Sequence, residues 1–187
     1  MNEIILASTS PRRKYLLKKA GIKFKAVDSK VKEYFDPKLK PHKLVEKLSL
    51  EKAQAVQKKF KQAIVIAADT LVAYGEKIMG KPKDREDAKM MLKILSGKTH
   101  SIVTGLTIIN GITGKIITRS EETKITMKII SEEEIESYVL TPESVDKAGA
   151  YAVQGKAAKF IKKIEGDLSN AIGLPINSLL QDLKSII

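Results

Sequence analysis

Six consecutive apolar residues at 63–68, Ala-Ile-Val-Ile-Ala-Ala, constrain the fold of this 187-residue chain more than any other segment. A short apolar run without alternation predicts a strand that is fully buried in a sheet. Helical patterns lie on either side of it, at residues 41–60 and from Asp84 to residue 95. Strands that alternate with helices are typical of an α/β fold, in which helices flank a central sheet.

A β-hairpin later in the chain indicates that the sheet is mixed and not purely parallel. We expect a strand at 102–109, a turn at 110–114 and a long alternating strand at 115–130. The remaining expected strands are 4–7, 24–27, 151–153 and 160–164, and the remaining helices are 12–20, 131–140 and a C-terminal helix after residue 175. The sequence therefore predicts a mixed, twisted β-sheet flanked by helices, in one domain over residues 1–187.

Composition excludes several kinds of site. The chain has no cysteine, which rules out a disulfide framework, a cysteine-ligated metal and a thiol nucleophile. No stretch approaches the ~20 consecutive apolar residues of a transmembrane helix. The N-terminus, with Glu3 before a short apolar run, is typical of a first core strand and not of a signal peptide. We expect a cytoplasmic protein without a membrane partner.

Positive charge is concentrated in the first third of the chain. Residues 1–63 hold 17 Lys and Arg against 6 Asp and Glu, a net charge of +11, whereas the whole chain carries +12. Such a field attracts phosphate, on a nucleotide or on a nucleic acid. A solvated lysine surface without a partner explains the same charge, so charge alone leaves the three interpretations open.

Hydroxyls and guanidiniums occupy a predicted strand-to-helix junction, Ser8-Thr9-Ser10-Pro11-Arg12-Arg13. Ser10 is suited to cap the helix, and Pro11 suits its first position. A helix start offers free N–H groups to an anion, and arginine forks match phosphate. The alternative is an ordinary helix start with two surface arginines. Neither a GxxxxGK[ST] loop nor a GxGxxG loop is present.

Lys52 interrupts the apolar stripe of the predicted helix at 41–60. The stripe runs through Val45, Leu48, Val56 and Phe60, and the helical step from 48 to 56 passes through position 52. A lysine there is unfavourable unless an anion meets it. It is either a phosphate ligand at the floor of a cleft or a lysine whose ammonium snorkels to solvent.

Asp69 follows the buried run 63–68, at the carboxyl end of the predicted central strand, although residues 71–74 could extend that strand. Ligands of open α/β sheets bind at that edge, where a carboxylate serves as a metal ligand or a base. Glu33, in a basic loop, could join it in holding a divalent metal, and Lys81, held before Pro82, could bind phosphate. Each of these residues also has an ordinary interpretation, as a turn aspartate, a surface glutamate or a surface lysine. The two histidines are too few for a zinc site.

Taken together, these residues resemble the motifs of the Maf family. The matching motifs follow the family's order and cover nearly the whole chain. They are Ser8-x-Ser10-Pro11-Arg12-Arg13, Glu33, Lys52, Ala68-Asp69-Thr70, Gly80-Lys81-Pro82, Ser96-Gly97-Lys98-Thr99-His100 with Thr104-Gly105, Asp146-Lys147-Ala148-Gly149-Ala150-Tyr151-Ala152-Val153-Gln154-Gly155, and Asn170 with Gly173-Leu174-Pro175.

The resemblance implies a nucleotide pyrophosphatase, with two lobes around a central cleft and the fold of the inosine triphosphate pyrophosphatases. Such enzymes cleave a nucleoside triphosphate between the α- and β-phosphates and require a divalent metal such as Mg, Mn or Co. The family is also linked to inhibition of septum formation. Asp69-Thr70 and the block 146–155 resemble the branch that acts on dTTP, UTP and modified pyrimidine nucleotides, and not the branch that prefers 7-methylguanosine triphosphate.

The resemblance also implies a role for each matching residue. Ser8, Ser10, Arg12, Arg13, Lys52 and Lys81 would bind the triphosphate and stabilise the leaving pyrophosphate. Glu33 and Asp69 would position the metal, and Asp69 would activate the attacking water. Thr70 would support Asp69 and help to recognise the base, and Gln154 would contact substrate or orient the water. The chain departs from the family pattern at Lys32, where an acidic residue is usual, and at Met127, where Phe is common.

Two functions of other classes remain as alternatives: a basic nucleic-acid-binding module, and a nucleotide-sensing regulator of cell division without turnover. The first does not account for Asp69 or Lys52, and the chain lacks the interleaved aromatics of single-strand binders. We expect a small-molecule nucleotide substrate and no stable nucleic-acid complex. A homodimer would be usual for the family, although no stretch identifies an interface.

Overall fold

The computed structural model describes residues 3–186, and the chain divides into two compact units. Unit 1 comprises residues up to 69, residues 104–121 and residues from 173 onward, and unit 2 comprises 70–103 and 122–172. The chain therefore passes from one unit to the other at 69/70, 103/104, 121/122 and 172/173. The assignment of 1–187 to one domain stays a prediction.

A seven-stranded sheet has the order β2-β1-β3-β5-β6-β7, with β4 paired to β3. The strands are β1 (Ile4–Leu6), β2 (Lys25–Ala26), β3 (Ile64–Tyr74), β4 (Lys77–Met79), β5 (Thr99–Asn110), β6 (Ile116–Met127) and β7 (Ile161–Glu165). β1 pairs parallel with β2 and β3, whereas β4 and β7 pair antiparallel with β3 and β6. The predicted mixed sheet is confirmed.

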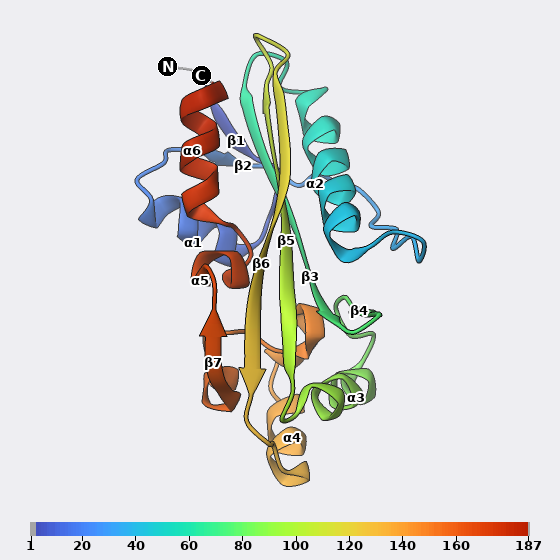
Figure 1. Cartoon of the computed structure of the whole chain (residues 1–187). Helices are drawn as coiled ribbons and strands as arrows, with labels where there is room; N and C mark the ends of the chain where they lie inside the picture. Colours follow the sequence, from blue (N-terminus) through green and yellow to red (C-terminus); the bar gives the residue numbers. More distant parts are fainter. Residues whose placement is uncertain (1–2, 187) are drawn as a thin grey trace. The chain divides into compact units, whose positions relative to one another are not determined.

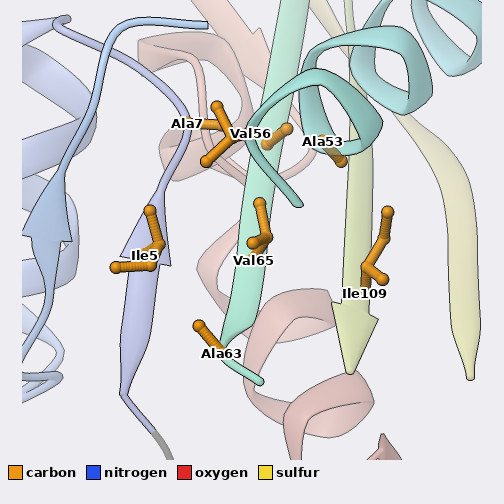
Figure 2. Packing of buried hydrophobic residues seen from close by; sticks show 8 residues of the cluster. Ile5, Ala7, Ala53, Val56, Ala63, Val65 and Ile109 are labelled. Carbon is orange, nitrogen blue, oxygen red and sulfur yellow. The ribbon is translucent and has the colours of Figure 1, made fainter. Parts of the chain in front are cut away.

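Three helices flank the strands of unit 1: α1 (Pro11–Lys19), α2 (Pro41–Gln57) and α6 (Ile176–Ile186). α2 covers one face of these strands, and α1 and α6 lie on the other (Figure 1). Because side chains alternate along a strand, odd-numbered residues of β1, β3 and β5 share the face toward α2. Ile5, Val65 and Ile109 pack there with Ala53 and Val56 of α2 (Figure 2).

Gly105 of β5 permits a close approach to α2. A Cβ atom at this position would overlap the backbone carbonyl of Val45 and approach the backbone nitrogen of Glu46 to 2.9 Å. Ser49, one helical turn further along α2, is hydrogen-bonded to Thr107 of β5 at 2.8 Å between the hydroxyl oxygens. These contacts hold α2 close to the sheet. The following turn of α2, which contains Lys52, is therefore also held close to the sheet.

Unit 2 contains α3 (Arg85–Leu95), α4 (Glu132–Val139) and α5 (Leu168–Ile172). The predicted helix starts are confirmed, since Asp84 accepts a hydrogen bond from the Asp87 backbone N–H at 2.8 Å and Ser131 forms a capping box with Glu134. α3 packs against α4. None of the helices in residues 3–186 is long and apolar enough to cross a membrane.

Residues 151–153 do not form the predicted strand. They follow Gly149 and Ala150, whose positive φ angles of 67° and 65° turn the chain, and 3-10 turns flank the segment on both sides. All of residues 151–153 are nonetheless buried. The apolar pattern therefore predicted their burial correctly, but it did not indicate strand pairing. α5, with five residues, is too short for helical periodicity to reveal it in the sequence.

His100 of β5 is a buried core residue, 3% exposed, and its Nε2 is hydrogen-bonded to the Tyr151 hydroxyl at 2.5 Å. Burial lowers the pKa of His100 from 6.5 to about 4. Between these pH values the unfolded chain binds a proton that the folded chain does not, so stability falls as the pH decreases through this window.

We predict that His100→Gln, which removes the titrating group, flattens this pH dependence. Between pH 7 and pH 4.5, the wild type should lose about 2–3 kcal/mol more of its free energy of unfolding than the variant. Urea unfolding of both proteins at the two pH values measures the difference. Equal losses would contradict a neutral, buried His100.

Candidate active site

Asp69 lies within β3, because residues 71–74 extend the strand to Tyr74 and pair with β4 from Val72 onward. The parallel partner β1 ends at Leu6, which is opposite Ile66. Asp69 therefore lies just past the carboxyl end of β1. It shares a strand face with Val65 and Ala67, the face that α2 covers, and its side chain is buried.

Lys52 meets Asp69 from the inward stripe of α2. The stripe runs through Val45, Leu48 and Val56 as predicted, although α2 ends at Gln57, before Phe60. The Lys52 side chain is 8% exposed, and its ammonium forms an ion pair with the Asp69 carboxylate. The snorkelling interpretation is therefore wrong: two carboxylates, and not solvent, surround this ammonium.

Glu33 supplies the second carboxylate. It lies in the loop between β2 and α2, and its Oε1 accepts a hydrogen bond from Lys52 Nζ at 2.6 Å. Its side chain is 42% exposed. We refer to these three residues as the Asp69–Lys52–Glu33 cluster, which is buried at Asp69 and open to water at Glu33.

Ser8 and Arg13 form the second part of the site. Ser8 Oγ accepts hydrogen bonds from the Ser10 backbone N–H and from Arg13 Nη1, both at 3.2 Å, so its own proton is suited to donate to an anion. Arg13 Nε donates to the Gly173 carbonyl at 2.8 Å. Ser10 occupies the N-cap of α1, but its side chain forms no capping hydrogen bond, contrary to expectation.

Electrostatics couple these two parts. Burial lowers the pKa of Arg13, while Asp69 and Glu33 raise it. Burial raises the pKa of Asp69 above its usual value, even though Lys52 opposes the effect. Asp69 is therefore a more basic carboxylate than an exposed aspartate, held among cations that an anionic ligand would share.

The remaining predicted site residues are Arg12, Thr70, Lys81 and Gln154. Arg12 is half-buried in the first turn of α1. Thr70 follows Asp69 in β3, so its side chain lies on the opposite strand face. In unit 2, Lys81 pairs with Asp146 at 2.9 Å, both being exposed, and Gln154 is exposed. Their roles in substrate binding stay predictions.

Sequence reasoning assigned no role to the Gly173 carbonyl or to Asp146. Gly173 lies 160 residues after Arg13, and no rule of spacing connects the two. Its φ of 122°, which favours glycine, is visible only in the structure. The sequence signals were the Gly173-Leu174-Pro175 motif and the motif that begins at Asp146.

The carboxylates of Glu33 and Asp69 fit a divalent metal. Both bind the same ammonium, so their oxygens already converge on one cation, and oxygen ligands suit Mg²⁺. Among residues 3–186, no group of three or more His, Cys, Asp and Glu side chains is arranged to hold a metal. Mg²⁺ commonly takes only one or two carboxylates and completes its shell with water and substrate phosphates, which matches this pair.

The chain resembles a solved structure and several curated sequence relatives over nearly its full length. In the solved structures, the Ham1 protein of Staphylococcus aureus superposes with a TM-score of 0.54 at 12% identity, over 98% of this chain and 99% of that one. At this identity the likeness concerns the fold alone. It confirms the predicted α/β fold class, and the two compact units agree with the predicted lobes.

Sequence relatives are much closer. The dTTP/UTP pyrophosphatase of Thermoanaerobacter sp. strain X514 is 48% identical over 183 residues, 97% of this chain and 95% of the relative. The enzyme of the same name from Bacillus cytotoxicus is 45% identical over 184 residues, 98% of this chain and 95% of the relative. The model of the Maf-like protein family matches residues 3–186. The chain is therefore a member of the Maf family.

Proposed function

We propose that this protein is a nucleoside triphosphate pyrophosphatase that hydrolyses dTTP and UTP to the monophosphate and pyrophosphate. Relatives at 45–48% identity carry the name dTTP/UTP pyrophosphatase over nearly their whole length. The structural observation that carries the proposal is the Asp69–Lys52–Glu33 cluster, in which the buried Asp69 carboxylate lies against the Lys52 ammonium. A base held beside cations suits the attack of water on a polyanion.

The chain's own residues would divide the work between binding and proton transfer. The Ser8 hydroxyl and the Arg13 guanidinium, already hydrogen-bonded to each other, would hold phosphate oxygens. Asp69 Oδ would take the proton of the attacking water, and its raised pKa improves it as a base. The bond between the α- and β-phosphates would then break, with positive side chains stabilising the charge on the departing pyrophosphate.

Glu33 and Asp69 would hold the divalent metal, which when bound would neutralise phosphate charge and orient the triphosphate. Because these are the only two protein ligands that we assign, the nucleotide's own phosphates are expected to strengthen metal binding. Thr70, Lys81 and Gln154 keep their predicted roles in recognising the substrate.

The direct test is product analysis with a panel of nucleoside triphosphates in Mg²⁺, Mn²⁺ or Co²⁺, and with a chelator. We expect one pyrophosphate per monophosphate from dTTP and UTP, no inorganic phosphate, and no turnover in the chelator. Failure to release pyrophosphate from any pyrimidine nucleotide would overturn the proposal. Salt-dependent filter binding of nucleic acid without turnover would favour the basic binding module instead.

The two neighbouring arginines are predicted to contribute unequally. Arg13→Lys should lower kcat/KM for dTTP by at least about 10-fold, because lysine cannot keep both the Ser8 and Gly173 bonds of the guanidinium fork. Arg12→Lys, a change of the same kind one residue away, should have a smaller effect. Steady-state kinetics of both variants decide the matter, and equal losses would mean that Arg13 is not the principal phosphate ligand.

A further inference from the structure

Lys52 contacts both of the carboxylates that we propose as metal ligands. Its ammonium donates to Glu33 and Asp69 at once, at 2.6 Å from Glu33 Oε1. One cation therefore already binds the two carboxylates that a divalent metal would use.

Removal of the lysine would leave the carboxylates poorly compensated. Asp69 is 4% exposed, and a buried carboxylate without a partner is costly. Arg13 also interacts with both carboxylates electrostatically, while its side chain is hydrogen-bonded to Ser8 and Gly173. The ammonium of Lys52 contacts both Glu33, from a loop, and Asp69, from a strand, and so helps to keep them together.

We propose that Lys52 is an internal counter-cation that holds Glu33 and Asp69 together in the metal-free protein and competes with the divalent metal for them. Metal binding then requires the ammonium to leave the carboxylates. The phosphates of a nucleotide offer the displaced ammonium a new anionic partner, so metal and nucleotide should bind cooperatively. The inference rests on the proposed function only in taking Glu33 and Asp69 as the metal ligands.

The first test measures Mn²⁺ affinity without nucleotide, by calorimetry or by the electron paramagnetic resonance signal of free Mn²⁺. We expect Lys52→Gln to bind Mn²⁺ at least 10-fold more tightly than the wild type. Lys47→Gln is the matched control, because Lys47 is an exposed lysine on the same helix and its loss changes the net charge equally. It should change the affinity less than threefold.

The second test uses the wild-type protein, so it does not depend on the folding of the variant. Amine acetylation followed by mass spectrometry reports how accessible each lysine is. Lys52 should be protected without metal, and its labelling should rise at least threefold in saturating Mn²⁺. Labelling of Lys47 should not change.

Equal or weaker Mn²⁺ binding by Lys52→Gln, or unchanged labelling of Lys52, would overturn the proposal. Neither readout involves turnover, so the two proposals fail separately. A tighter variant in a protein that hydrolyses no nucleotide would support the counter-cation and reject the pyrophosphatase. Pyrophosphate release by a protein in which Lys52→Gln does not change the Mn²⁺ affinity would support the pyrophosphatase and reject the counter-cation.

Discussion

Asp69→Asn is expected to lower kcat for pyrophosphate release from dTTP by ~10²–10⁴-fold, the range typical for loss of a general base. The amide has the shape of the carboxylate and can still accept a hydrogen bond from Lys52, but it cannot take a proton from water. Lys52 keeps its second partner, Glu33, at 2.6 Å. The variant should therefore fold, and urea unfolding would verify this before the kinetics are interpreted.

Asp182→Asn provides a matched control for this experiment. Asp182 of α6 is also a buried aspartate, 5% exposed, and it forms an ion pair with Arg119 at 3.1 Å. Burial raises its pKa, although Arg119 opposes the effect. Its neutralisation reproduces the loss of a buried negative charge without touching the Asp69–Lys52–Glu33 cluster. We expect turnover close to that of the wild type. Activity of Asp69→Asn within a few-fold of the wild type would show that another group accepts the proton.

Gly105→Ala is expected to lower the free energy of unfolding by at least about 3 kcal/mol, a loss at the high end for single substitutions. The added methyl group would overlap backbone atoms of Val45 in α2, which cannot rotate away as a flexible side chain would. Since α2 also carries Lys52, a shift of the helix should reduce turnover as well. Urea unfolding at neutral pH, combined with the pyrophosphate assay, measures both effects.

Gly114→Ala separates the effect of this overlap from the general effect of replacing a glycine. Gly114, in the hairpin after β5, has a φ of 74° and no atom within 4 Å of an added Cβ. Its substitution should cost only the ~1–2 kcal/mol of a left-handed alanine. Similar losses for the two variants would show that the approach of β5 to α2 does not constrain the fold.

Features set by neighbouring residues could be predicted from the sequence. Asp84 and Ser131 cap helices through backbone groups three residues away, so the caps of α3 and α4 are visible as local patterns. An anionic partner for Lys52 was also one of the two predicted interpretations, because a lysine on an apolar stripe needs its charge compensated. Its partner carboxylates were candidates for the same site, but as ligands of a metal and not of the lysine.

Features that depend on which segment packs alongside were harder to predict. The apolar run ends at Ala68, but residues 71–74 were expected as a possible extension of the strand, and hairpin pairing with β4 does continue β3 to Tyr74. In contrast, burial of residues 151–153 looked like strand pairing because both require apolar side chains. There the missing information was which segment packs alongside, and no local pattern contains it.

The bond from Arg13 to the Gly173 carbonyl has a consequence for biosynthesis. The chain is made from its N-terminus, so the α1 guanidinium emerges from the ribosome 160 residues before the carbonyl that holds it. Until then the bond from Arg13 Nε to this carbonyl cannot form. A nascent or prematurely terminated chain would thus contain Ser8, Glu33, Lys52 and Asp69 and still lack a correctly held arginine, which ties the onset of activity to completion of the polypeptide.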